Sequence, residues 1–241
     1  MLYNTFIYKM NTQEEVKKHN ETGMNHLKEQ NFIGAYNSFY GALNIYETEM
    51  TTYPEQEENK VQYLNFSQMA STMLILEFKT NNGKEHLVQA VEILQKSVNI
   101  CLTYRVKYDI YLLTTLLCDC YELQNNYKEI EKLHISNINY LKEQYNPNHA
   151  QDYAKNYSTL YYNQSLLVMT EENKDLILYY SRISIILLIE IYKINQDKNI
   201  FAHFIDRETL RSVNFTEEEI EDTLKLFDDG KVTEITLNYN K

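Results

Sequence analysis

Small and apolar residues recur at helical spacing along most of this chain. Within Val16–Glu47, Gly23 and Ala35 lie on either side of a polar turn, and Phe39 and Leu43 follow at helical intervals. Small residues at such positions let two antiparallel helices cross closely, and the larger ones fill the space toward a neighbouring pair. The pattern therefore predicts a helical hairpin.

Weaker copies of this rhythm follow along the chain. A helix around Phe66–Met73 pairs with one that contains Ala90 and Leu94, and the turn between them is predicted to be long, over Lys79–His86. A third pair is predicted over Tyr111–Glu143, with its turn at Asn125 and Tyr127, and a fourth over Gln151–Met169 and Lys174–Asn195. We therefore expect an all-α fold, an array of about four antiparallel helical hairpins.

The two prolines fall in polar stretches between the predicted hairpins. Pro54 lies within Thr51–Lys60, and Pro147 lies within Tyr145–Gln151. Because proline cannot continue a helix and restricts the residue before it, these positions predict boundaries near residues 52 and 147.

The C-terminal segment follows a different pattern. Thr216 and Glu219 form a capping box, with Phe215 and Ile220 as a possible hydrophobic staple, so a helix is expected to start at Glu217 and end before Gly230. Residues 231–237 then alternate as a strand does, and residues 2–8 have comparable β character, so the termini could pair with each other or with a partner. We divide the chain into an N-terminal arm (1–10), a helical repeat domain (11–212), and a C-terminal capping helix with a strand-like tail (213–241).

The first hairpin resembles the tetratricopeptide repeat. Its span is close to the 34-residue period, and Gly23 followed by Phe32, Ala35, Phe39, Ala42 and Leu43 is similar to the small-residue and Ala-x-x-x-Phe-x-x-Ala-Leu pattern of that family. Positions that usually hold Trp, Leu and Tyr hold His19, Thr22 and His26 here. The resemblance implies a curved solenoid (TPR-like) that binds proteins on a concave face built from the first helix of each hairpin.

Nine residues are expected to line that concave face and bind a partner. They make a groove that is basic at one end and acidic at the other, suited to a peptide of mixed charge: Lys17, Asn20, Met24, Leu27 and Lys28 in the first hairpin, Ser67 and Ser71 in the second, and Asp119 and Glu122 in the third. Chaperone adaptors of the family hold a carboxylate with basic residues, but the corresponding positions here are Asn20, Met24, Thr115 and Asp119. Because these positions lack the basic residues that hold a carboxylate, the comparison with the family argues against a co-chaperone.

The charge balance restricts the class of partner. A net charge of -11 at pH 7 repels nucleic acid and anionic lipid at long range, so direct nucleic-acid binding is not expected. The first ten residues make a poor signal peptide, and the longest apolar run, Ile183–Ile189, is far shorter than a membrane span. With three cysteines in a chain that needs no disulfide, we expect a soluble, cytoplasmic protein without membrane insertion.

No pattern for catalysis or metal binding stands out. Cys118 and Cys120 would point apart on a helix, and His19 and His26 would lie about 10 Å apart, too far to share an ion. There is no nucleophile elbow and no Gly-rich phosphate loop. We therefore expect no enzyme activity, no metal site and no cofactor.

Tyrosine is the most unusual feature of the composition, with 22 residues and no tryptophan. Tyr153, Tyr157 and Tyr161 are spaced to share one helix face, and so are Tyr104, Tyr108 and Tyr111. Both sets are interpreted as core residues, with exposed anchors for a partner as the alternative.

The leading functional hypothesis is a non-catalytic interaction module or scaffold subunit of a multi-protein assembly. One alternative is a helical-repeat subunit with a winged-helix-like cap, similar to scaffold subunits of proteasome-lid-type complexes, because Asp229 to Val232 follows a capped helix. Another is a ribosome-associated factor, with the acidic body facing basic ribosomal proteins.

Overall fold

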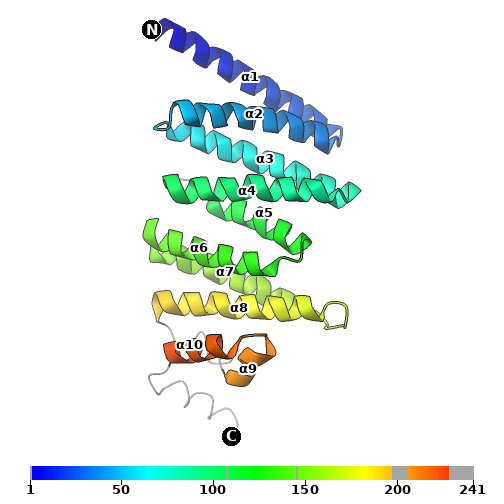
Figure 1. Cartoon of the computed structure of the whole chain (residues 1–241), viewed down its shortest axis with the longest axis vertical. Coiled ribbons are helices and arrows are strands. Elements are labelled where there is room, and N and C mark those ends of the chain that lie inside the picture. Colours follow the sequence, from blue (N-terminus) through cyan, green and yellow to red (C-terminus); the bar gives the residue numbers. More distant parts are fainter. Residues whose placement is uncertain (1, 107, 145, 197–205, 228–241) are drawn as a thin grey trace. The chain divides into compact units, whose positions relative to one another are not determined.

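The computed structural model describes residues 2–106, 108–144, 146–196 and 206–227, and every regular element in these ranges is an α-helix (Figure 1). The expectation of an all-helical array is confirmed at that level. The chain divides into two compact units, Met1–Asn126 and Tyr127–Lys241. The helices of the first are α1 (Leu2–Lys28), α2 (Phe32–Thr52), α3 (Glu57–Asn81), α4 (Lys84–Tyr104) and α5 (Ile110–Leu123); those of the second are α6 (Tyr127–Gln144), α7 (Pro147–Ser165), α8 (Lys174–Asn195), α9 (Arg207–Ser212) and α10 (Glu217–Phe227).

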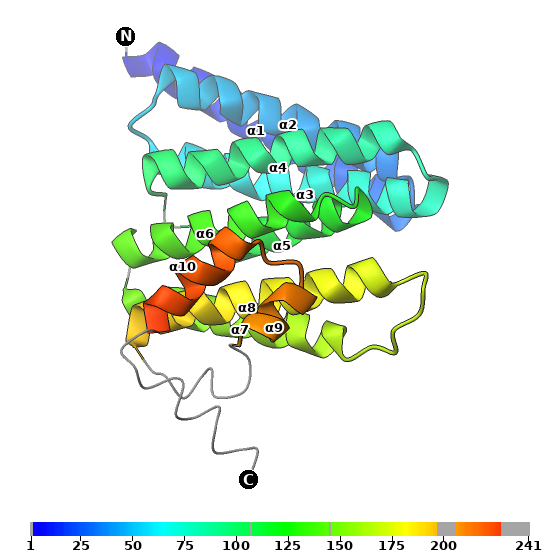
Figure 2. The same cartoon turned by 60° about the horizontal axis from the view of Figure 1, so that its bottom comes forward.

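Within the first unit, successive helices pack against each other and alternate between two layers (Figures 1 and 2). α2 and α4 share one layer, in which Lys96 of α4 forms an ion pair with Glu47 of α2. α1, α3 and α5 form the other layer, and α3 contacts α5 directly. Large buried side chains such as Phe39, Tyr63 and Leu94 supply the core of this unit.

The first predicted hairpin is present as α1 and α2, with a turn of three residues. A Cβ added at Gly23 would lie 2.5 Å from Cε1 of Phe39, whose side chain is fully buried, so the close crossing depends on glycine at this position. The strand character expected for residues 2–8 is wrong, because these residues continue α1. Leu2, Phe6 and Met10 also recur at intervals of four, a spacing that suits a helix.

The second hairpin has a much shorter turn than expected. α3 runs on to Asn81 and α4 begins at Lys84, so the long turn predicted over Lys79–His86 is wrong. Asn82 adopts a left-handed conformation (φ 57°), and its N–H donates to the Phe78 carbonyl at 2.7 Å. Since asparagine tolerates this conformation better than most residues, it ends the helix abruptly and needs only Gly83 to complete the turn.

The Tyr104, Tyr108 and Tyr111 set does not share a helix face. α4 ends at Tyr104 because Arg105 adopts a left-handed conformation (φ 54°), and α5 begins only at Ile110. Tyr104 and Tyr111 are exposed, and Tyr108 is partly buried. The core interpretation of this set is therefore wrong. α5 and α6 match the third predicted pair in sequence, although they belong to different units.

The second unit is built around aromatic side chains carried by α6, α7 and α8, which contact one another. Tyr153, Tyr157 and Tyr161 of α7 are all buried, as expected for core residues. His134 of α6 lies among them, with its ring centroid 4.5 Å from that of Tyr157. α7 begins at Pro147, capped by the Asn146 side chain, which confirms the predicted boundary.

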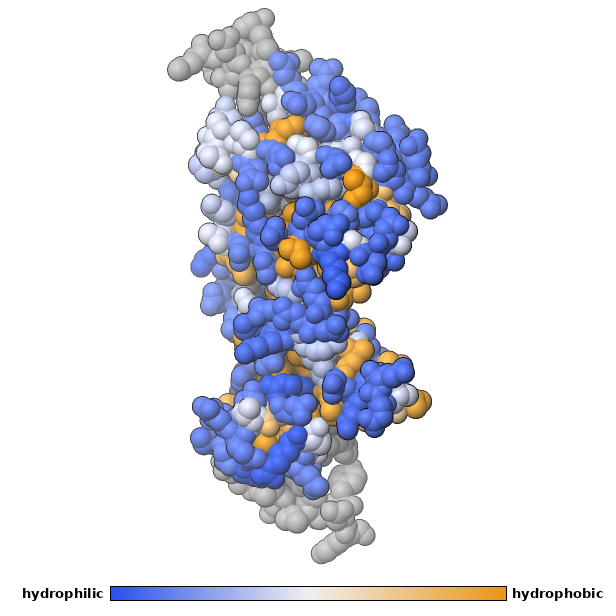
Figure 3. All heavy atoms as spheres, turned by 45° about the vertical axis from the view of Figure 1, so that its right-hand side comes forward, coloured by the Kyte–Doolittle hydropathy of each residue, from blue (hydrophilic) through white to orange (hydrophobic). Residues whose placement is uncertain are grey.

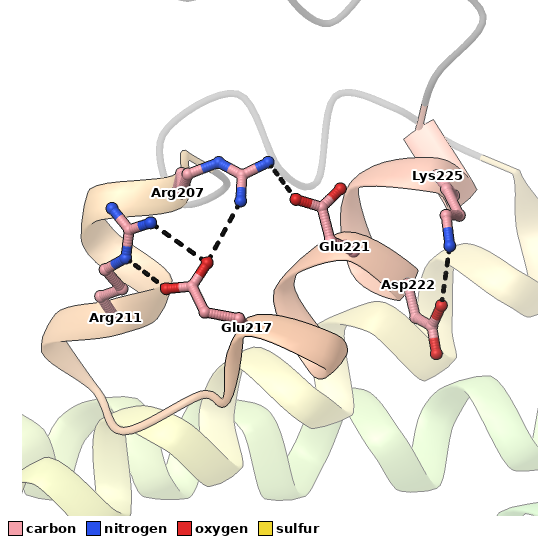
Figure 4. Close-up of polar contacts among 6 residues, drawn as sticks. All are labelled: Arg207, Arg211, Glu217, Glu221, Asp222 and Lys225. Carbon is pink, nitrogen blue, oxygen red and sulfur yellow. Dashed lines mark hydrogen bonds and ion pairs between the residues drawn. The ribbon is translucent and has the colours of Figure 1, made fainter.

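The two short C-terminal helices form a small hairpin held by exposed ion pairs (Figure 4). Arg207 of α9 pairs with Glu217 and Glu221 of α10, and Arg211 makes two contacts with Glu217 at 2.6 and 3.1 Å. Water screens exposed pairs of this kind, so they contribute little to stability. Buried Leu210 and other apolar residues supply the rest of the contact.

The capping box predicted at the start of α10 is confirmed. The Thr216 N–H donates to Glu219 at 2.7 Å, and the Glu219 N–H donates to the Thr216 hydroxyl at 3.3 Å. Arg182 of α8 holds the start of α10 against α8, because it donates to Glu219 at 2.7 Å and stacks on the Phe215 ring. The strand-like pattern over residues 231–237 lies outside the described residues.

Candidate protein-binding surface

Polar side chains of α3 meet Tyr108 and α5 within the α1, α3 and α5 layer of the first unit. Tyr108, which lies just before α5, reaches across to α3, where its hydroxyl lies 3.2 Å from the amide oxygen of Asn65 and 3.1 Å from that of Gln68 and shares its single proton between them. Both amides are partly exposed. With their oxygens held by the hydroxyl, the two amides keep their nitrogens to donate to a bound segment.

The Tyr108 hydroxyl remains a hydrogen-bond donor throughout the physiological pH range. Burial raises the pKa of Tyr108 to about 12, with smaller contributions from Cys101 and Asp109. The phenol therefore stays protonated at physiological pH, and the positions of Asn65 and Gln68 do not depend on pH through this group.

Acidic residues lie on α5 of the same layer. Asp119 and Glu122 of α5 are partly buried, and burial raises the pKa of Glu122 to about 7, with the nearby charge of Asp119 adding to the shift. Burial also raises the pKa of Asp119, which the ammonium of Lys79 on α3 partly offsets. A bound cation would stabilise both carboxylates, whereas a bound carboxylate would be repelled.

The first-hairpin residues predicted to bind a partner lie on α1. Lys17, Met24 and Lys28 are exposed, and Asn20 and Leu27 are partly buried. Lys17 makes a weak contact of 3.9 Å with Glu21, one turn further along the same helix. These five side chains are therefore accessible, as the hypothesis of a binding face requires.

Ser67 and Ser71 do not lie on an accessible surface. Both side chains are fully buried, and the Ser67 hydroxyl donates to the Tyr63 carbonyl at 2.8 Å within α3. Small side chains at these positions let neighbouring helices approach closely, as Ala70 does between them. These two residues are therefore unavailable to a partner, and Asn65, Gln68 and Thr72 occupy the partly exposed face of α3 instead.

Sequence reasoning missed the contribution of Asn65, Gln68 and Tyr108. The spacing of Asn65, Gln68 and Thr72 is that of one helix face, so the signal was present. The role of Tyr108 could not be read, because the break at Arg105 turns it away from α4 and toward α3.

Titratable groups in the core are arranged for packing. His134 lies between two tyrosines, with Nδ1 3.2 Å from the Tyr153 hydroxyl and Nε2 3.5 Å from that of Tyr161. Cys101, Cys118 and Cys120 are buried and form no disulfide, and burial raises the pKa of Cys101 and of Cys120 to about 12. In the described part of the chain, no three His, Cys, Asp or Glu residues are grouped so as to hold a metal ion.

Comparisons with known proteins add no relative. No family model, no curated protein and no solved structure matches this chain. Among the helices the structure describes, none has the length and apolar character to cross a membrane.

Proposed function

We propose that this chain is a protein-binding subunit, which holds an extended segment of another protein on the α1, α3 and α5 layer of its first unit. The observation that carries the proposal is the pair of amides at Asn65 and Gln68, fixed from behind by Tyr108. Side-chain amides held in this way can donate to the carbonyl groups of an extended backbone whatever its sequence.

The charged side chains of the same layer favour a particular kind of segment. Lys17 and Lys28 provide exposed cations on α1, and Asp119 with Glu122 provides carboxylates on α5. A segment with a basic residue over α5 and acidic residues toward α1 would complement both. The resemblance of the first hairpin to tetratricopeptide repeats supports the same function, since that family binds proteins on the corresponding layer.

The proposal is tested by affinity purification of the tagged chain from its native cells, followed by mass spectrometry and size-exclusion chromatography. We expect a co-eluting protein that is retained by the wild type and largely lost from a variant with Asn65→Ala and Gln68→Ala. The matched control carries Gln89→Ala and Asn99→Ala, which remove two exposed amides from α4 in the other layer.

Loss of the partner from both double variants would point to general destabilisation, which circular dichroism would reveal. Retention by both would move the binding surface elsewhere on the chain. A chain that elutes without any partner would contradict the proposed function itself.

A further inference from the structure

The connection between α7 and α8 exposes four consecutive aliphatic residues. Leu166 is 64% exposed, Leu167 57%, Val168 83% and Met169 51%. Sequence reasoning placed them inside a helix extending to Met169, but α7 ends at Ser165. Six of the thirteen exposed large hydrophobic residues that the structure describes lie within Leu160–Met169.

The other seven occur singly, apart from the neighbours Tyr111 and Leu112. The face of the molecule drawn in Figure 3 is mostly hydrophilic, with hydrophobic residues in small groups. Single exposed apolar residues are normal, but a run of four is unfavourable in water and marks a binding site or an aggregation hazard. The structure of the connection distinguishes these two.

The connection is held in a defined conformation by one side chain. The Oδ1 of Asn173 accepts from the Thr170 N–H at 2.6 Å, and its Nδ2 donates to the Val168 carbonyl at 3.0 Å. Two turn bonds, Leu166 N–H to Asn163 and Leu167 N–H to Gln164, continue from the end of α7.

Because its side chain bonds to the connection, Asn173 does not cap α8. It is the residue directly before α8, where an asparagine side chain ordinarily caps the helix, yet it makes no such bond. Its side chain therefore secures the apolar connection and leaves the start of α8 without a side-chain cap. An aliphatic loop ordered before binding loses less entropy when a partner covers it.

The charges next to the loop restrict what can cover it. Glu171, Glu172 and Asp175 are exposed within six residues of Met169, against the single cation Lys174. An anionic lipid surface would be repelled by this acidic border. A second copy docked loop to loop would bring two acidic borders together, which is also unfavourable.

We propose that the connection from Leu166 to Met169 is a docking loop, which inserts into an apolar groove bordered by Lys or Arg on a different protein. The inference rests on the proposed function, since it assigns a second contact surface to a protein-binding subunit. The docking loop lies in the second unit, whereas Asn65 and Gln68, called the amide strip below, lie in the first. Each surface can therefore be altered by mutation without changing the other.

The test places the photo-crosslinking residue benzoylphenylalanine at position 168 of the full chain in its native cells. The matched control places it at position 88, because Val88 of α4 is another exposed valine. We expect position 168, and not position 88, to crosslink to a protein peptide that contains apolar residues and Lys or Arg.

The partner identified in this way is then purified and its Kd measured. Val168→Asp is expected to weaken binding by about 10- to 100-fold, since it replaces a buried aliphatic contact by a charge. Val88→Asp should leave the Kd unchanged, and Asn173→Ala should weaken binding while every apolar side chain is retained. Rising salt should weaken the wild-type complex.

Crosslinking of position 168 to lipid, or to another copy of the chain, would overturn the inference. It would also be overturned if the partner bound Val168→Asp as tightly as the wild type, in which case the proposed function would stand on the amide strip. If the wild type retains no partner at all, the proposed function fails as well.

Discussion

At the scale of single residues, one buried histidine makes the stability of this molecule depend on pH. His134 is 1% exposed, and both ring nitrogens face tyrosine hydroxyls. Burial lowers its pKa from the ordinary 6.5 to about 3. The imidazole is therefore neutral in the folded chain at any pH where the protein is expected to work.

The depressed pKa predicts a loss of stability in acid. Between pH 6.5 and about 3 the unfolded chain takes up a proton at His134 that the folded chain refuses, so the free energy of unfolding falls as pH falls. This group contributes a slope of at most about 1.4 kcal/mol per pH unit. In urea unfolding across this range, His134→Gln should show a shallower dependence than the wild type. The control His149→Gln changes an exposed histidine and should follow the wild type. Equal slopes in all three would contradict the assignment.

Tyr108 gives a second prediction at this scale. Tyr108→Phe keeps the ring but removes the hydroxyl that holds Asn65 and Gln68, so the free energy of unfolding should fall by about 1 kcal/mol. The partner of the amide strip should also bind more weakly, because the two amides are no longer fixed. Tyr104→Phe removes an exposed hydroxyl and should change neither quantity. A variant that binds normally would show that the amides need no such support.

At the scale of elements, α1 and α2 meet at two glycines whose surroundings differ. A methyl group at Gly23 would meet the ring of Phe39, which is fully buried and has no room to move. At Gly41 it would meet the ring of His19, which is partly exposed and free to swing toward solvent. The two glycines thus test whether rigid packing or helix propensity decides the outcome.

Gly23→Ala is expected to lower the free energy of unfolding by about 1–3 kcal/mol, the usual range for overpacking a core, despite the better helix propensity of alanine. Gly41→Ala should be neutral or stabilising by up to about 1 kcal/mol. Thermal unfolding of the two variants beside the wild type measures both. If Gly23→Ala proved as stable as Gly41→Ala, the crossing would be looser than the packing of Phe39 implies.

The elements also show what a sequence pattern can and cannot specify. Helix ends with a local chemical cause, such as Pro54 and the Thr216 capping box, are predicted well because the responsible groups are adjacent in sequence. Ends caused by a left-handed residue at Asn82 or Arg105 were missed, since neither residue is a glycine. The face of α3 was misassigned because Ser67 and Asn65 are both polar, and only the neighbouring helices decide which is buried.

The whole molecule consists of two units, each with its own core. Phe39, Leu94 and other aliphatic and aromatic residues fill the first, whereas the second combines tyrosines of α7 and α8 with many buried isoleucines and leucines. Units that each bury a core can fold independently. The binding surfaces proposed above also fall one to each unit, so the chain could join two proteins.

We therefore expect fragments 1–126 and 127–241 to unfold cooperatively when produced separately. Far-ultraviolet circular dichroism should show helix in both. The near-ultraviolet tyrosine signal should be stronger for 127–241, because its rings are packed in contact with one another, as Tyr161 and Tyr180 are at 5.8 Å. A fragment that is helical but melts without a cooperative transition would show that its core needs the rest of the chain.

The three buried cysteines allow the separation of α4 from α5 to be measured by thiol labelling. Cys101 belongs to α4, and Cys118 and Cys120 belong to α5, so every thiol in the chain lies within these two helices. With raised pKa values and no access to solvent, Cys101 and Cys120 should resist thiol reagents until the pair separates. The rate of labelling in native buffer would then measure how often this part of the first unit opens, without any added probe, and a partner bound across α3 and α5 should slow it.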